Sequence, residues 1–310
     1  GVAPTRETVA LVMHTSGTTR RAKVVPLPHG QLCVGAICVA STLRLTHSSL
    51  AINVMPLFHL HGLMVCVLVS AVAGGAVLCA PEFDAAAFFD CLQPIAAEAG
   101  GEAEAETGRP PPDWYSAVPT IHMEVLRQAE VARRATPTPS FHSLRLVRNC
   151  SAALPPTVGS ALEAALPGAS VLTTYAMTEA LPICSNPLQA GAPRDLSSVG
   201  PAAGPEVAVV DFAASGEGGE AGGEARGETG PRSPLPEVRP LPAGEPGEVV
   251  VRGRCVFRGY EAREHLGFDP NEGAFAAGGW LRTGDKGWLG ASSAHLTLTG
   301  RFKEIINRAG

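Results

Sequence analysis

The sequence predicts an α/β fold, in which a buried and mostly parallel sheet with flanking helices is followed by a smaller β-rich subdomain. Short runs of Val, Leu and Ile recur along residues 1–198 with helix-length segments between them. This pattern is typical of strands that are buried on both faces. After residue 198 strand patterns continue without long helices between them, which indicates a second, β-rich region.

The expected elements follow one another along the chain. Strands are expected in the first region at Val9–Met13, Ala51–Met55, Ala76–Ala80, Leu144–Val147 and Ser170–Leu172. Helices are expected between them at Gln31–Ser41, Gly62–Ala73, Ala85–Leu92, Ile121–Arg133 and Thr157–Ala165. In the second region we expect strands at Glu206–Phe212, Glu248–Gly253 and His295–Thr299.

The chain is therefore divided into an α/β subdomain at residues 1–198 and a β-rich subdomain at residues 199–300. A disordered insertion is predicted at residues 213–246, because Ala213–Pro234 contains seven Gly, four Glu and no Val, Ile, Leu or aromatic residue. A second insertion, Ala96–Pro112, carries four Glu and ends in three prolines. Neither segment can bury enough apolar surface to order itself.

Composition excludes several classes of protein. A net charge of -5 without a basic run argues against nucleic-acid binding, which needs clustered Lys and Arg. The eight cysteines never form a CxxC pair, which favours buried, reduced thiols. The uncharged stretch Gly62–Pro81 has the length of a membrane span, but Gly74 and Gly75 divide it into a helix and a strand, so no span is predicted.

The segment Leu11–Leu27 has the composition of a phosphate-binding loop. An apolar strand, expected to be buried, runs into hydroxyl-bearing residues and ends near a lysine, although the Walker pattern GxxxxGK[ST] is absent. Hydroxyls, turning backbone amides and a mobile ammonium can together bind phosphate oxygens. An ordinary turn is the alternative. The candidate residues are Thr15, Ser16, Gly17, Thr18, Thr19 and Lys23.

A second group, Tyr175–Glu179, follows the short strand near residue 171. Ligands of α/β folds bind where strands end. Tyr175 could stack on a base, Thr178 could bind a phosphate and the Glu179 carboxylate could bind Mg²⁺. The alternative interpretation is the start of a helix that Thr178 caps.

Two further patterns are weaker. His59 and His61 alternate after a predicted strand, where they could supply half of a metal site, but pocket lining is favoured because no third ligand accompanies them. Near the end of the chain, Asp285 could accept both hydroxyls of a ribose and Arg301 could donate to the same sugar. A surface hairpin with Asp285 in a turn is equally compatible with that segment.

The order and spacing of all these motifs resemble one family. TSGTTxxxK, PLFHLHG, YAMTE, GEVVVRG with RGY, GWLRTGD and GRFKEIINR occur in the order found in adenylate-forming enzymes, the acyl-CoA synthetase and luciferase superfamily. The resemblance extends from about Leu11 to Gly310. The sequences HTSGTT, WYSAVPTIH, Cys150–Ala152 and YAMTEA are most similar to the oxalyl-CoA synthetase branch, the peroxisomal-CoA-synthetase-like proteins.

The resemblance implies a fold, a reaction and a set of residues. It implies the large N-terminal domain of these enzymes, with a distorted barrel as its β-rich part, and an acid–thiol ligase that uses ATP, Mg²⁺ and coenzyme A on a small-molecule carboxylate. A small dicarboxylate such as oxalate suits the polar candidates His59, His61 and Ser151.

The resemblance also implies a role for each motif residue. Carried over by position, the loop from Thr15 to Thr19 and Lys23 would hold the β and γ phosphates, and Thr178 would hold the α phosphate. Glu179 would bind Mg²⁺. Tyr175 and the Ala152–Ala153 backbone would flank adenine, Asp285 and Arg301 would hold the ribose, and Lys303 marks a hinge within residues 301–310.

Departures from the family pattern leave alternatives open. Arg20, Ala22 and Val24 stand where the family usually has small residues, Pro and Gly, and a positive φ at Val24 would be strained. Relative to the family the chain lacks an N-terminal part and the C-terminal domain, so we expect low activity. An aryl or medium-chain acyl-CoA ligase and a catalytically impaired nucleotide-binding remnant are the two alternatives. The branch implies a cytoplasmic or peroxisomal location.

Overall fold

The computed structural model describes residues 3–15, 22–92, 111–135, 143–189, 192–211, 235–262 and 267–302. Contacts between Cα atoms group the chain into two compact units. Unit 1 comprises Gly1–Gly35, Ala176–Cys184 and Gly200–Gly310, and unit 2 comprises Ala36–Tyr175 and Ser185–Val199. This grouping differs from a single boundary at residue 198, because the first 35 residues group with the later part of the chain.

Unit 2 is built on a parallel sheet. Five of its strands have the order β4-β3-β5-β6-β7, and every neighbouring pair among these five is parallel. The strands are short and apolar, which is why the pattern of Val, Leu and Ile runs predicted most of them. Their bounds are β3 (Leu50–Asn53), β4 (Ala76–Cys79), β5 (Trp114–Ala117), β6 (Leu146–Asn149) and β7 (Ser170–Met177).

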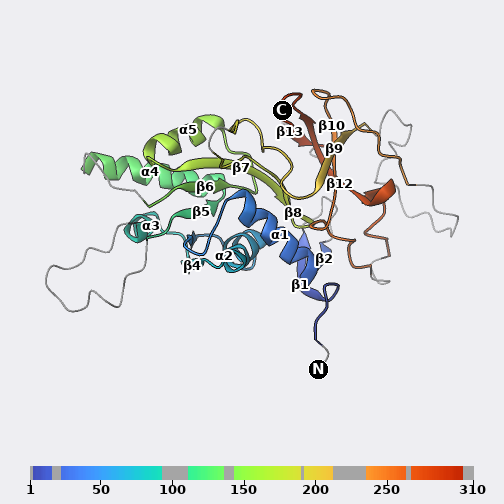
Figure 1. The fold of residues 1–310 in the computed structure, drawn as a ribbon, viewed down its shortest axis with the longest axis horizontal. Coiled ribbons are helices and arrows are strands. Elements are labelled where there is room, and N and C mark those ends of the chain that lie inside the picture. The colour runs from blue at the N-terminus through green and yellow to red at the C-terminus, as the bar shows by residue number, and fades with distance from the viewer. Residues whose placement is uncertain are drawn as a thin grey trace. The chain divides into compact units, whose positions relative to one another are not determined.

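Helices lie on both faces of this sheet. On one face α3 (Ala85–Leu92), α4 (Pro119–Ala135) and α5 (Pro156–Ala165) pack against Tyr115 and Val147, and α4 lies beside α5 in Figure 1. The π-helix η1 (His61–Leu68) packs on β3 and β5 and continues into α2 (Val69–Ala73). Because successive strand residues face opposite ways, η1 contacts the face that Ser116 occupies. The helix predicted at Gln31–Ser41 is present as α1 (His29–Thr42).

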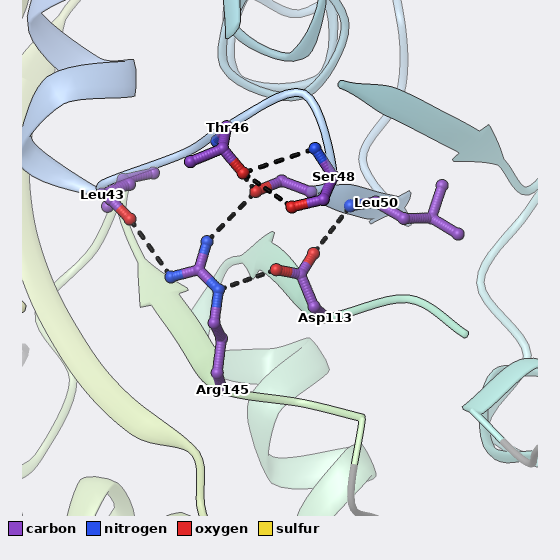
Figure 2. A network of polar contacts seen from close by, with 7 residues as sticks. Leu43, Thr46, Ser48, Leu50, Asp113 and Arg145 are labelled. Atoms are coloured by element: carbon purple, nitrogen blue, oxygen red, sulfur yellow. Dashed lines mark hydrogen bonds and ion pairs between the residues drawn. The ribbon is translucent and has the colours of Figure 1, made fainter. Parts of the chain in front are cut away.

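An ion-pair network ties the amino ends of three strands together (Figure 2). Arg145, just before β6, donates from Nε to Asp113 Oδ2 at 2.7 Å, from Nη1 to the Leu43 carbonyl and from Nη2 to Ser49 Oγ. Asp113, just before β5, accepts at Oδ1 from the amide of Leu50, the first residue of β3. This network lies at the edge of the sheet opposite the carboxyl ends where ligands of such folds bind.

Unit 1 begins with an antiparallel hairpin of β1 (Val9–Thr15) and β2 (Lys23–Pro28). The expectation that the first strand is buried is wrong, because Val9 and Val12 are exposed and β1 pairs only with β2 in its sheet. The strain considered for Val24 is absent as well. Val24 lies within β2 opposite His14 and is not among the residues with positive φ.

The β-rich part of unit 1 is an antiparallel sheet of five strands with the order β11-β12-β10-β9, in which β13 also pairs with β12. Residues 235–246 of the predicted insertion are described: Pro240 bridges Val210, and the Gly244 amide donates to the Leu289 carbonyl. Residues 212–234 lie outside the described residues. The strands are β9 (Glu206–Val210), β10 (Gly247–Arg252), β11 (Phe275–Ala276), β12 (Trp280–Leu289) and β13 (Leu296–Arg301), and β8 (Ala180–Ser185) also belongs to this unit.

Within the described ranges, no helix combines the length and the apolar character that a membrane crossing requires.

Candidate active site

A chain of hydrogen bonds runs from the loop after β6 into the interior of unit 2. His61, the first residue of η1, contacts Ser151 Oγ through Nδ1 at 3.2 Å and Ser116 Oγ through Nε2 at 2.6 Å. Ser116 lies in β5 and Ser151 follows β6, so both flank the carboxyl ends of parallel strands. The structure thus brings together His61 and Ser151, two of the three residues predicted to contact the substrate.

Arg148 extends this series of hydrogen bonds, although no sequence motif predicted a role for it. Its Nη1 donates to Ser116 Oγ at 3.2 Å, and the residue is 1% exposed in the middle of β6. Among the described residues no carboxylate lies within ion-pair distance of its guanidinium. A buried ion without an opposite charge destabilises a fold on the order of several kcal/mol, so such an ion is a marker of function. The signal in the sequence is a charged residue inside a buried, otherwise apolar strand.

His61 itself is buried and neutral. Burial lowers its pKa well below 6.5, and the positive charge of Arg148 lowers the pKa further, followed by His59 and His122. A neutral imidazole carries one proton and leaves its other nitrogen as a hydrogen-bond acceptor. His61 therefore serves as a link that accepts at one end and donates at the other.

His59 differs from the prediction of two alternating histidines on one strand. It is exposed, precedes η1, and its Nδ1 accepts from the His61 amide at 3.0 Å. Gly62 allows η1 to start here, because a Cβ at that residue would lie 2.5 Å from the Pro56 carbonyl oxygen. The described residues contain no group of three His, Cys, Asp or Glu side chains that could hold a metal ion.

The loop after β6 is ordered by Asn149. Its Nδ2 donates to the Ala152 carbonyl at 2.9 Å, and the Asn149 carbonyl accepts from Thr174 Oγ1 of β7 at 2.7 Å. Ala152 and Ala153 are exposed in this loop, and Tyr175 is 8% exposed in β7. Asn149 Oδ1 is buried and has no hydrogen-bond partner among the described residues, which leaves it available to a ligand donor.

In unit 1 the buried Glu179 is held by an aromatic residue. Tyr260 donates its hydroxyl to Glu179 Oε1 at 2.6 Å, and burial followed by the Glu179 charge raises the Tyr260 pKa. Thr178 and Glu179 form the turn between β7 and β8, so the helix start considered for them is wrong. Tyr260 stands in the RGY motif, where the motif itself could have pointed to it.

The same aromatic residue lies beside Lys23. The Lys23 ammonium is 4.4 Å from the centroid of the Tyr260 ring and donates to the Pro270 carbonyl at 2.9 Å. Lys23 pairs with Thr15 across the hairpin, so these two residues flank the candidate phosphate loop. Unit 1 thus brings Thr15, Lys23 and Glu179 into one region through Tyr260. The loop residues Ser16, Gly17, Thr18 and Thr19 lie outside the described residues.

Asp285 and Arg301 form a cross-strand pair. Asp285 in β12 lies opposite Arg301 in β13, and Arg301 Nε donates to Asp285 Oδ1 at 2.8 Å. The turn proposed for Asp285 is wrong, because β12 continues to Leu289. The Asp285 carboxylate is buried while the Arg301 side chain is half exposed. Lys303, the expected hinge residue, lies outside the described residues.

Comparisons with known proteins agree on one family. The model of the AMP-binding enzyme family matches residues 1–228. The chain is 36% identical over 305 residues to the probable CoA ligase CCL9 of Humulus lupulus, and 36% identical over 304 residues to an oxalate–CoA ligase of Arabidopsis thaliana. Each match covers 97% of this chain and 49% of the relative. The chain therefore spans about half the length of these curated relatives.

A solved structure shares the fold. ATP-bound MatB from Rhodopseudomonas palustris superimposes with a TM-score of 0.73 at 25% identity, covering 97% of this chain and 49% of MatB. The parallel sheet with flanking helices and the curled antiparallel sheet correspond to the N-terminal domain of adenylate-forming enzymes. With a family model that matches most of its length and relatives above 30% identity, this chain belongs to the AMP-binding, adenylate-forming enzymes.

Proposed function

We propose that the protein is an ATP-dependent acid–thiol ligase that joins coenzyme A to a small dicarboxylate such as oxalate. In the first step a carboxylate oxygen of the substrate attacks the α phosphorus of ATP, and pyrophosphate leaves. In the second step the thiol of coenzyme A loses its proton to solvent and its sulfur attacks the acyl carbon, so that the thioester bond forms, the bond from the acyl carbon to the AMP oxygen breaks, and AMP leaves. Adenylation is needed because a free carboxylate is a poor electrophile.

The observation that carries the substrate class is the hydrogen-bonded group of His61, Ser116, Arg148 and Ser151. A fatty or aryl chain gains binding energy from an apolar pocket, whereas this group offers hydroxyls, an imidazole and a buried positive charge. Polar donors of this kind match a second carboxylate. Relatives named as oxalate–CoA ligases from Arabidopsis thaliana and Saccharomyces cerevisiae support the same class.

The nucleotide is assigned to the motif residues. Thr15 and the loop that follows it, with Lys23, would bind the β and γ phosphates, and Thr178 would bind the α phosphate. Tyr175 and the Ala152–Ala153 backbone would flank adenine, whose amino group suits the vacant acceptor Asn149 Oδ1. Asp285 would accept the ribose hydroxyls, with Arg301 beside it.

Glu179 fits a magnesium ion that arrives with ATP. Mg²⁺ is usually held by one or two carboxylates together with substrate phosphates. Tyr260 occupies Oε1 of Glu179, which orients the carboxylate and leaves Oε2 as the candidate ligand. When bound, the ion would neutralise charge that develops on the phosphates.

The test is ATP–pyrophosphate exchange with oxalate, malonate, acetate and coumarate. The proposal predicts exchange above the acid-free blank with oxalate or malonate, and less with acetate and coumarate. A preference for coumarate would favour an aryl-acid ligase instead. If no acid raises exchange above the blank while ATP binds, the ligase assignment is wrong for this chain.

A further inference from the structure

We infer that Arg148 is a positioning residue that fixes the proton order of a relay, Arg148 to Ser116 to His61 to Ser151, so that Ser151 presents its hydroxyl hydrogen to an anionic group of the substrate. The inference rests on the proposed function for the nature of that substrate. The relay itself rests on the described side chains alone.

The order follows from the chemistry of the two ends. A guanidinium can only donate hydrogen bonds, so Ser116 Oγ must accept from Arg148 Nη1. Ser116 is fully buried, and the nitrogen that its own hydroxyl can reach is His61 Nε2 at 2.6 Å. A hydroxyl oxygen can accept two hydrogen bonds, but among the described residues His61 Nε2 is the acceptor within reach of the Ser116 hydrogen. That buried hydrogen is satisfied when Nε2 accepts it, which places the imidazole proton on Nδ1.

The outer half of the relay continues in the same direction. His61 Nδ1 then donates to Ser151 Oγ at 3.2 Å, which leaves the Ser151 hydroxyl hydrogen free for a ligand. Ser151 is exposed, whereas the other three members are buried, so the relay ends at a surface that a small molecule can reach. Each hydrogen bond in such a series polarises the next, and a charged first donor strengthens all of them.

The backbone conformation of Ser151 indicates that this arrangement belongs to a functional site. Ser151 has a φ of 71°, a left-handed conformation that residues with a side chain rarely adopt. Such strained residues concentrate at functional sites. In this conformation the loop places the Ser151 hydroxyl at His61 while Asn149 holds the adjacent Ala152 carbonyl.

The buried charge of Arg148 also gives the site a preference for anionic acyl groups. Arg148 has no carboxylate partner among the described residues, so an anion at the outer end of the relay gains favourable interaction that a neutral or apolar acyl group does not gain. Arg148 acts through Ser116 and His61 and does not itself need to contact the substrate.

The direct test is nitrogen-15 NMR of the histidine side chains. In the native chain we expect His61 to be neutral at pH 7 and in the Nδ1–H form. The groups that face His61 are Arg148 from β6, His122 from α4 and His59 beside it. Removing the guanidinium in Arg148→Met should raise the His61 pKa, and Arg148→Lys, which keeps the charge, should leave it low.

Ser116→Ala gives a second route that does not depend on the folding of Arg148→Met. It removes the donor to His61 Nε2, so the Nδ1–H form should give way to a mixture of both neutral forms. A native His61 in the Nε2–H form would overturn the relay. So would a tautomer that remains unchanged in Ser116→Ala.

Enzymatic readout separates this inference from the proposed function. In Arg148→Met the KM for oxalate should rise roughly tenfold, which corresponds to about 1.4 kcal/mol, with a smaller change for acetate. Arg148→Lys should recover part of the loss. If NMR confirms the relay but no variant shows oxalate-dependent exchange, oxalate is rejected as the substrate and the relay is kept. If oxalate-dependent exchange is observed but His61 is in the Nε2–H form, the relay is rejected and the substrate is kept.

Discussion

Ser151 combines an unfavourable backbone conformation with a hydroxyl that the site uses. A left-handed conformation costs a residue with a side chain about 1–2 kcal/mol, and Gly adopts it without this strain. The φ of 71° at Ser151 therefore allows stability and function to be separated by two small substitutions.

We predict that Ser151→Gly is more stable than Ser151→Ala by about 1 kcal/mol. Both variants lose the hydroxyl that His61 contacts, but only alanine keeps the strain. Both should lose oxalate-dependent exchange to a similar extent. Urea unfolding gives the stabilities, and equal stability of the two variants would show that the backbone is unstrained.

Glu179 is the residue on which the assignment of magnesium depends. Glu179→Gln keeps an oxygen that can accept from Tyr260 and removes the negative charge. We predict that ATP binding in the presence of Mg²⁺ weakens at least tenfold, on the order of 1.4 kcal/mol, whereas binding of ATP without the metal changes little.

Glu237→Gln is the matched control, because Glu237 is an exposed carboxylate paired with Arg239. It should bind ATP and Mg²⁺ as the native chain does. Equal losses in the two variants would remove Glu179 from the metal site.

At the scale of elements, the carboxyl ends and the amino ends of the strands in unit 2 have different roles. Its carboxyl ends hold His61, Ser116 and Ser151, while Asp113 and Arg145 tie together the amino ends of β3, β5 and β6 (Figure 2). The network at the amino ends fixes where each strand begins. It thereby fixes the register of the strands, and with it the positions of the side chains at their carboxyl ends.

Asp113→Ala tests this structural role. It leaves the Leu50 amide without its partner and removes the ion pair with Arg145. Both side chains are partly exposed, so we expect a loss of about 1–2 kcal/mol in the free energy of unfolding. Glu124→Ala, which removes an exposed pair with Arg127 on α4, should leave the unfolding midpoint unchanged. If Asp113→Ala leaves the free energy of unfolding unchanged, the network does not hold the strands together.

Sequence patterns predicted those elements whose apolar residues decide their structure. α3 was predicted at Ala85–Leu92, where it lies, and β3, β4 and β6 were predicted to within two residues. β5 was not predicted, and β7 continues to Met177, beyond the predicted Ser170–Leu172. β2 escaped prediction because its prolines argue against a strand, although a hairpin edge tolerates them. β12 escaped because glycines at Gly284 and Gly287 read as turns.

The candidate site was predicted less completely, because much of it depends on contacts between distant segments. His61 and Ser151 were named from motifs, but the connection from His61 through Ser116 to Arg148 requires β5 to lie beside β6. Arg148 and Tyr260 were missed for the same reason. A charged residue in a buried strand is a usable signal only when the strand is known to be buried.

At the scale of the whole molecule, two buried histidines couple stability to pH. Burial lowers the pKa of His122 to about 4, and that of His61 lies well below 6.5. Between the folded pKa and 6.5 the unfolded chain binds more protons than the folded chain, so stability falls as the pH falls. The shift of His122 alone corresponds to roughly 3 kcal/mol lost by pH 4.

Urea unfolding at several values between pH 7 and pH 4 measures this slope. His122→Gln, which retains a partner for the Tyr115 hydroxyl, should flatten the slope. An identical pH dependence in the native chain and this variant would mean that His122 titrates normally in the fold.

The central claim is that the chain binds one adenine nucleotide through the candidate residues, and titration calorimetry with ATP and Mg²⁺ tests it most directly. The native chain should give saturable heat with one nucleotide per chain. Tyr175→Ala and Asp285→Asn should each weaken binding at least tenfold, or about 1.4 kcal/mol. Saturable binding that neither substitution changes, or no saturable heat from the native chain, would contradict the account.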